Sequence, residues 1–234
     1  MTNATTTAGP STAAPLERTD AASIRTYAEA LRVFFSRRGP RLMAKHAALA
    51  WAGRLLLGPP SLTELPVLAG VVAWWPLQEW LAHRYLLHFR PRRLWGRTFD
   101  PIVARRHRAH HRDPRDVDLA LLPVQVVEAG IPANLAVWAV LGLGSPRRAA
   151  TGAATYATMA LLYEWTHFLV HTGIEPRSPF YRRLRRNHRM HHYRNEDYWL
   201  AFTWPDVDRW LGTEPDPASV PRSPTAMNLH GLSE

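Results

Sequence analysis

Apolar residues gather in four stretches along the 234-residue chain: Leu42–Gly58, Leu65–Ala82, Leu119–Gly144 and Ala149–Val170. A helix needs about 20 consecutive apolar residues to cross the hydrocarbon core of a bilayer. The last two stretches reach this length, and the second comes close to it. The first is short and carries Lys45, His46 and Arg54, so it crosses only with tilt or local thinning of the bilayer. The pattern predicts an all-α integral membrane protein, a helical bundle with about four spanning helices.

Composition divides the chain into a disordered tail (1–22), an amphipathic interfacial helix (23–40), a membrane domain (41–213) and a second disordered tail (214–234). The helix is predicted because Ile24, Leu31 and Phe34 recur at helical spacing, and Gly39 and Pro40 are expected to end it. It either lies in the membrane interface or packs on the soluble face of the protein itself.

The net charge of +10 comes almost wholly from arginine, since Lys45 is the only lysine. Ten arginines lie in residues 84–117 and seven in residues 172–194, whereas the connector after Gly58 has none. This alternation is typical of a multi-pass membrane protein whose basic segments and termini are cytoplasmic. Arg147 and Arg148 are the exception, on the outer side. No nucleic-acid reading motif accompanies the charge, so no nucleic-acid partner is expected.

The chain has no cysteine, which excludes disulfides, thiolate zinc sites and cysteine-bound iron–sulfur clusters. Histidine is abundant instead, and ten of the twelve histidines fall in four clusters. The clusters are His83 and His88; His107, His110 and His111; His167 and His171; and His188, His191 and His192. Under the predicted topology, all four lie on the cytoplasmic side and form a histidine-rich cap.

Neutral imidazole is a good ligand for iron, zinc and copper. Ten imidazoles exceed the coordination number of one ion but suit two ions with four or five nitrogens each and an open position. A polar patch on a helix explains a single pair of histidines better than it explains four clusters. The two halves of the chain, EW…H with HRAHH and EW…H with HRMHH, are similar either through duplication or through convergence on ligand spacing.

Acidic residues near the clusters are candidates for orienting the imidazoles or, alternatively, for plain salt bridges to arginine. They are Glu79, Glu164, Asp113, Asp116 and Asp118. The two remaining histidines are read as ordinary residues, His46 at the interface and His230 in the loose tail. No catalytic residue beyond the metal ligands, and no organic cofactor, is predicted.

The order HRYLLH, HRAHH, THFLVH and HRMHH resembles the fatty acid hydroxylase branch of the fatty acid hydroxylase/sterol desaturase superfamily, most closely the fatty acid 2-hydroxylases. Glu79 to His88 matches the first box of that family, E-[YW]-x-x-H-R-[FY]-L-[FL]-H. The second box, H-G-x-H-H, is met with Arg108 in place of glycine. Pro123 resembles the proline segment that follows. Thr166, His167 and His171 match the third box, and His188, His191, His192 and Tyr193 match the fourth. DRWLGT, from Asp208 to Thr213, resembles the ending W-D-x-x-F-G-T.

The resemblance covers roughly residues 45–213 and implies a membrane hydroxylase with two iron ions, for which zinc can substitute in purified protein. It carries over all ten clustered histidines as ligands. It also implies a membrane lipid substrate, O₂ and a separate electron-donor protein, because no fused cytochrome b-type domain is seen. The reaction expected is hydroxylation of a lipid C–H bond. The alternatives are a desaturase or a carotenoid or sterol oxidase with the same site, or a metal-binding membrane protein without redox chemistry.

Overall fold

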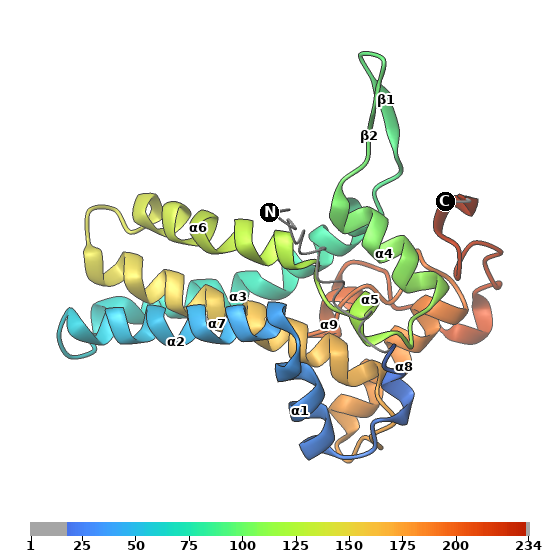
Figure 1. The fold of residues 1–234 in the computed structure, drawn as a ribbon, viewed down its shortest axis with the longest axis horizontal. Helices are drawn as coiled ribbons and strands as arrows, with labels where there is room; N and C mark the ends of the chain where they lie inside the picture. The colour runs from blue at the N-terminus through green and yellow to red at the C-terminus, as the bar shows by residue number, and fades with distance from the viewer. Residues whose placement is uncertain (1–17, 233–234) are drawn as a thin grey trace, which may run out of the picture.

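The computed structural model describes residues 18–232, and the disorder predicted for residues 1–17 lies outside this range. The described chain is mostly helical, as expected. Four long helices lie side by side and form a bundle (Figure 1). They are α2 (Arg38–Leu56), α3 (Leu65–Leu81), α6 (Val124–Leu141) and α7 (Pro146–His171). Each corresponds to one of the four apolar stretches predicted from the sequence.

Helix α7 is the centre of the bundle, since it contacts α2, α3 and α6. Small residues let its neighbours approach closely. A Cβ atom placed on Gly152 would lie 2.0 Å from the ring of Trp138 on α6, so only glycine fits there. Asn134 of α6 adds a polar link, because its amide donates to the carbonyl of Ala153 and to Nε2 of His46, each at 3.0 Å.

Much of the bundle surface is apolar. Leu56 is 87% exposed and Val140 75% exposed, and a large exposed apolar surface marks a site of contact with a membrane or another protein. Within residues 18–232, one helical segment, Val117–Leu141, is long and apolar enough by itself to cross a membrane. Only 6% of its most apolar window is buried inside the protein, so its surface faces outward.

The N-terminal helix α1 (Tyr27–Ser36) lies within the range predicted for an amphipathic helix. Thr26 and Glu29 form a reciprocal capping box at its start. Phe34 is buried against α7, with its ring centroid 5.0 Å from that of Trp165. Gly39 and Pro40 do not end this helix as predicted. They lie in the first turn of α2, where proline is tolerated, and extended Arg37 separates the two helices.

Short elements at one end of the bundle form a cap. They are a π-helical turn (Ala82–Leu87) that continues α3, α4 (Ile102–Arg112), α5 (Val117–Ala120), α8 (Pro179–Tyr193) and α9 (Asp206–Trp210). Strands β1 (Arg92–Leu94) and β2 (Arg97–Phe99) form an antiparallel hairpin that projects away from the bundle (Figure 1). Single 3₁₀ turns complete the described chain at Ala21–Ser23, Leu62–Glu64, Pro217–Ser219 and Leu229–Gly231.

Two predictions of disorder are wrong for the described residues. Asp20 accepts a hydrogen bond from the N–H of Ala22 and pairs with Asp116, so residues 18–22 are not a free tail. Residues 214–232 pack against the cap, with Ala226 2% exposed and Leu229 fully buried. Their composition has few large apolar residues, but backbone hydrogen bonds and these small apolar anchors hold the segment in place.

A buried ion pair generates a first prediction. Arg54 is 2% exposed, pairs with Glu64, and donates to Thr151 Oγ1 at 3.0 Å and the Gly58 carbonyl at 2.8 Å. Glu64→Leu leaves the guanidinium buried without its carboxylate, so we expect the unfolding free energy in detergent to fall by about 3 kcal/mol.

The exposed pair of Arg38 and Glu128 is the matched control. Glu128→Leu should cost less than about 1 kcal/mol, since exposed ion pairs contribute little. The double variant Arg54→Met with Glu64→Leu should recover most of the stability. Equal losses for Glu64→Leu and Glu128→Leu would contradict the role assigned to the buried pair.

Candidate metal centre

The first histidine pair depends on a change of helix type. His83 and His88 are five residues apart, a spacing that does not stack side chains on an α-helix. The π-helical turn Ala82–Leu87 corrects this, because its hydrogen bonds connect residues five apart. The N–H of His88 donates to the carbonyl of His83 at 3.2 Å, and the two rings lie with centroids 4.8 Å apart.

The other clusters use ordinary α-helical spacing. His107 and His111 on α4 are four residues apart, as are His167 and His171 at the end of α7. Helix α8 is polar on one side and buries Leu184, His188, His191 and His192 on the other. Residues four apart share one face of a helix, so these pairs point together into the cap.

The fold brings all ten clustered histidines together as two groups of five. The first group is His83, His88, His107, His111 and His191, and the second is His110, His167, His171, His188 and His192. Within each group, the potential ligand nitrogens all lie within 4.8 Å of one another. The groups are adjacent, with the ring centroids of His111 and His192 4.3 Å apart. Both HxxHH motifs contribute to both groups.

Hydrogen bonds fix the proton positions in the first group. The Nδ1 atoms of His83, His111 and His191 lie 2.6, 2.7 and 3.0 Å from the backbone carbonyls of Leu200, Ala226 and Tyr198. A carbonyl can only accept, so each Nδ1 carries the proton and each Nε2 is a bare acceptor in the neutral ring. Nε2 of His111 nevertheless lies 3.1 Å from Nε2 of His191. Two lone pairs at this distance repel each other unless a cation lies between them, so the group fits a metal ion.

The second group has the same character. Nε2 of His188 lies 2.7 Å from Nε2 of His171 and 2.9 Å from Nε2 of His192. Both ring nitrogens of His110 are buried, and neither has a hydrogen-bond partner within residues 18–232. Buried polar atoms of native proteins are normally satisfied, so such nitrogens indicate a ligand.

Burial keeps the cap histidines neutral, which is the form that binds metal. It lowers the pKa of His111 to about 3, although the hydrogen bond to Ala226 acts in the opposite direction. The pKa values of His107 and His188 are also lowered, first by burial and then by neighbouring histidines. Neutral nitrogen donors in two close groups can therefore hold two metal ions without competition from protons at neutral pH.

Within residues 18–232, no hydrogen bond or ion pair joins the acidic residues singled out in the sequence to the clustered histidines. Asp113 and Asp118 pair with Arg18 and Arg37, which is the salt-bridge alternative. Asp116 caps α5 by accepting from the N–H of Asp118 and also lies 3.7 Å from Arg18. The orienting groups are instead backbone carbonyls. A carbonyl has no residue-type signature, so the sequence could not reveal these partners.

Two buried glutamates act on the backbone around the site. Glu79 accepts from the N–H groups of Phe202 and Thr203 and from the hydroxyl of Thr203 at 2.6 Å. Glu164 accepts from the N–H of Leu122 at 2.7 Å. Each glutamate thus ties a bundle helix to a cap loop, and Glu79 fixes the segment that presents the Leu200 carbonyl to His83.

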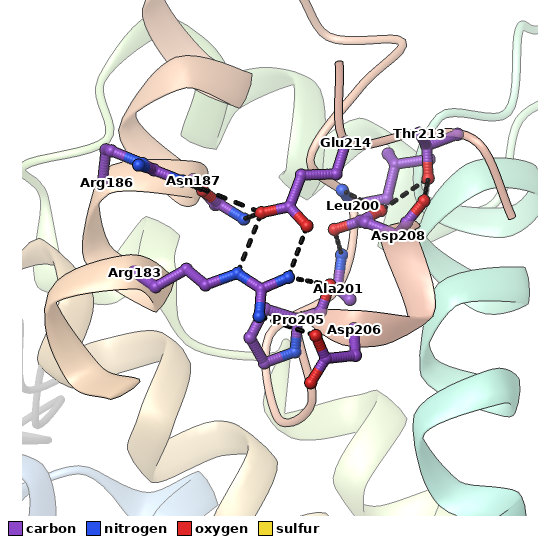
Figure 2. A network of polar contacts seen from close by, with 10 residues as sticks. All are labelled: Arg183, Arg186, Asn187, Leu200, Ala201, Pro205, Asp206, Asp208, Thr213 and Glu214. Carbon is purple, nitrogen blue, oxygen red and sulfur yellow. Dashed lines mark hydrogen bonds and ion pairs between the residues drawn. The ribbon is translucent and has the colours of Figure 1, made fainter. Parts of the chain in front are cut away.

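Figure 2 shows the polar network that folds the loop between α8 and α9. Asp208 accepts from the N–H groups of Leu200 and Ala201, each at 2.9 Å, and from Thr213 Oγ1 at 2.7 Å. This explains the phrase DRWLGT: its aspartate and threonine shape the loop that orients His83. The resemblance of DRWLGT to the ending of the family motif pointed to Asp208 and Thr213, although their role was not evident from the sequence.

The same network fastens the loop to α8 (Figure 2). Arg183 Nη1 donates to Asp206 at 2.7 Å, and its Nε donates to Glu214 Oε1 at 2.9 Å. Asn187 donates to the same Glu214 oxygen at 2.9 Å. Since Asn187 precedes His188, this clamp of Arg183, Asn187, Asp206 and Glu214 links α8, which carries three of the clustered histidines, to the carbonyl-bearing loop.

Arg108, which replaces the glycine of the second box, contacts residues on either side of the β1–β2 hairpin. It is 2% exposed and pairs with Asp100 Oδ2 at 2.6 Å. It also donates to the Phe89 carbonyl at 3.4 Å. Arg108 therefore anchors the base of the β1–β2 hairpin beside His88.

A mainly apolar cavity of about 300 Å³ lies among α2, α3, α6 and α7. A smaller space of about 20 Å³ adjoins it and is lined by His107 and His167, one from each group. The two cavities share Leu87, Val103 and Tyr163 as wall residues. The bundle cavity therefore leads toward the junction of the two histidine groups.

Comparisons with known proteins agree with this site. The fatty acid hydroxylase family model matches residues 68–213, which include all ten clustered histidines, and the chain belongs to this family. It is 28% identical over 151 residues to the dihydroceramide fatty acyl 2-hydroxylase FAH2 of Arabidopsis thaliana, covering 64% of this chain and 60% of that protein. It is also 28% identical over 130 residues to the fatty acid 2-hydroxylase of Macaca fascicularis, covering 52% of this chain and 32% of that protein.

The solved structure of scs7p, in which only the hydroxylase domain is visible, has the same fold. The TM-score is 0.60 at 24% identity, over 85% of this chain and 70% of that one. The chain spans about 60% of the length of the plant relatives that it matches. The resemblance to fatty acid hydroxylases drawn from the histidine boxes is thus confirmed at the level of the family.

The clamp generates a pH-dependence prediction. Partial burial alone would raise the pKa of Glu214. Hydrogen bonds from Arg183 and Asn187 outweigh this effect, so the pKa lies below the ordinary value of 4.5. A carboxylate with a depressed pKa stabilises the fold fully above its unfolded pKa and loses this contribution as the pH falls through its folded pKa. The stability gap between wild type and Glu214→Gln should therefore be largest at neutral pH and shrink below about pH 4.5.

Thermal unfolding of detergent-solubilised protein across this pH range measures the gap. Glu175→Gln is the matched control, because the side chain of Glu175 is 86% exposed and its only ion pair within the described residues, to Arg185, is 3.7 Å long. A pH-independent gap for Glu214→Gln would contradict the clamp.

Proposed function

We propose that this protein is a di-iron membrane oxygenase that hydroxylates a lipid acyl chain at a C–H bond, using O₂ and electrons from a separate donor protein. The observation that carries the proposal is the pair of converging five-histidine groups with bare, mutually facing nitrogens. Family membership and the names of the relatives support lipid hydroxylation. The ten histidines are proposed as the metal ligands.

Each group would hold one metal ion. His83, His88, His107, His111 and His191 provide one set of nitrogens, and His110, His167, His171, His188 and His192 provide the other. Iron bound there would supply the activation of O₂, with one oxygen atom inserted into the C–H bond and the other leaving as water, at the expense of two electrons from the donor protein and two protons. Zinc, which takes the same nitrogen donors, is expected to replace iron in purified protein without supporting the reaction.

The protein's own part is to bind and orient the chain. The bundle cavity is lined mainly by apolar side chains, and it shares wall residues with the space beside His107 and His167. An acyl chain lying in this cavity would present one carbon to the junction of the two groups. The buried, apolar surroundings exclude water, which favours reaction at the chain over unproductive reduction of O₂.

The exposed apolar surface of α2, α3, α6 and α7 supports a multi-pass arrangement in which the bundle lies in the bilayer. We propose that the cap and both termini are cytoplasmic, since the cap holds most of the arginines. The substrate chain would then enter from lipid, and the electron donor would approach from the aqueous side.

Replacing one ligand should separate chemistry from membrane insertion. We expect His191→Ala to abolish the hydroxylated lipid and to reduce bound metal, because His191 faces His111 in the first group. Lipid mass spectrometry of cells that express wild type or variant measures the product as the gain of one oxygen atom. Loss of two hydrogens instead would indicate desaturation.

Immunoblotting of alkali-washed membranes controls for expression and insertion. His191→Ala should remain in the membrane at the wild-type level, because it leaves the apolar bundle unchanged. His192→Ala, in the second group, should behave in the same way. Full hydroxylase activity with normal metal content in His191→Ala would show that its ligand assignment is wrong. Tight metal binding by a wild type that gives no oxidised lipid with any donor would favour a protein without redox chemistry.

The cavity generates a chain-length prediction. Gly130 lines the cavity on α6, and a side chain added there meets open space rather than a neighbouring helix. It lies six residues beyond Val124, the first residue of α6, or roughly 9 Å along the helix from the end nearest the cap. Gly130→Phe should fill the far part of the cavity and change the ratio of rates for long and short acyl chains by roughly tenfold or more in favour of short ones.

Gly70→Phe is the matched control, because it also meets open space but lies on α3 outside the cavity lining. Competition between acyl chains of different lengths in detergent or nanodiscs measures both variants. Equal chain-length profiles for Gly130→Phe and wild type would place the substrate chain elsewhere, without affecting the metal assignment.

A further inference from the structure

We propose that residues 220–232, the C-terminal strap, position the first histidine group and so determine whether its metal ion is retained. The inference rests on the metal binding proposed above. The strap lies beyond residue 213, where the match to the family model ends.

Two hydrogen bonds connect the strap to candidate ligands. The Nδ1 of His111 donates to the carbonyl of Ala226 at 2.7 Å, which leaves Nε2 of that ring free to face the metal position. Nε2 of His230 donates to the backbone carbonyl of His88 at 2.9 Å. Within residues 18–232, both bonds go to the first group. The Nδ1 atoms of His110, His188 and His192 in the second group have no partner in the same range.

The strap is held firmly enough to act on these residues. It begins where Arg194, at the end of α8, donates through Nε to the Val220 carbonyl at 2.8 Å and accepts from the N–H of Ser223 at 2.7 Å. Ala226 and Leu229 are buried, and Leu229 is fully inaccessible. The N–H of Gly231 donates to the Asn228 carbonyl at 2.8 Å, which closes a tight turn around His230.

The two candidate ligands contacted by the strap both lie at helix ends. His88 follows the last residue of the π-helical turn, and His111 is the second-last residue of α4. Carbonyl groups in the last turn of a helix lack intrahelical partners, so such ends fray. The strap fixes the ring of one ligand and the backbone of the other. Losing such a partner typically weakens metal binding about 10–100-fold.

The test uses the full chain in detergent, with Zn²⁺ as the probe in equilibrium dialysis. Wild type should bind two ions per chain. Leu229→Asp places a charge at the buried position that holds the strap against the cap. It should weaken one of the two sites about 10–100-fold and leave the other unchanged. Met227→Asp is the matched control, because Met227 is in the same strap but 47% exposed.

A second pair of variants acts on the hydrogen bond alone. His230 has a φ of +64°, a conformation that asparagine tolerates better than most residues. His230→Asn retains a donor and should preserve more of the affinity of the weakened site than His230→Leu. These variants keep the inference testable if Leu229→Asp does not fold, as circular dichroism and thermal unfolding would show.

Combining variants shows which site the strap controls. Leu229→Asp added to His111→Ala should weaken Zn²⁺ binding little further, because both act on the first group. Added to His167→Ala, it should weaken both sites. Two ions bound with unaltered affinity by Leu229→Asp and His230→Leu would overturn the strap's role alone. A wild type that binds fewer than two ions would overturn the dinuclear proposal and the strap's role with it.

Discussion

The cap of this protein is organised around the repulsion between uncharged imidazole nitrogens. Three rings of the first group are held by their Nδ1 protons on backbone carbonyls, and their bare Nε2 atoms face inward at about the distance of a hydrogen bond that they cannot form. Buried lone pairs in this arrangement are unfavourable without a cation. Metal ions bound there would replace this repulsion with coordinate bonds. Stability and function are therefore expected to depend on the same ten side chains.

Holding the rings requires a second layer of interactions that is mostly backbone. Leu200 and Tyr198 present carbonyls from the loop after α8, and Ala226 presents one from the strap. Buried carboxylates in turn hold this backbone: Glu79 binds the N–H groups of Phe202 and Thr203, and Asp208 binds those of Leu200 and Ala201. Each carboxylate satisfies donors that would otherwise be buried without partners. The loop is thus held by hydrogen bonds where it touches the histidines, although it contains little regular secondary structure.

The distribution of ligands bears on the similarity of the two halves of the chain. The first group takes four histidines from the first half and His191 from the second, and the second group takes four from the second half and His110 from the first. A reciprocal exchange of this kind follows naturally from two copies of one motif related by approximate symmetry. If the two halves had instead converged on the same spacing, each half would have had to acquire independently the one histidine that it contributes to the other group. The arrangement favours duplication, and it makes each candidate metal position depend on both halves being folded.

The sequence by itself determined the features that depend on the spacing of residues close together in the chain. Four apolar stretches gave the four long helices, and spacings of four residues placed His107 with His111 and His167 with His171. The ten clustered histidines could be named because their residue type and spacing are both written in the chain. The π-helical turn that aligns His83 with His88, the division into two groups, and the packed strap were decided only by the tertiary structure. The physical reason is that the orienting partners are backbone carbonyls from distant segments, which carry no residue-specific signal, and that the strap is held by small buried residues whose composition resembles that of a disordered tail.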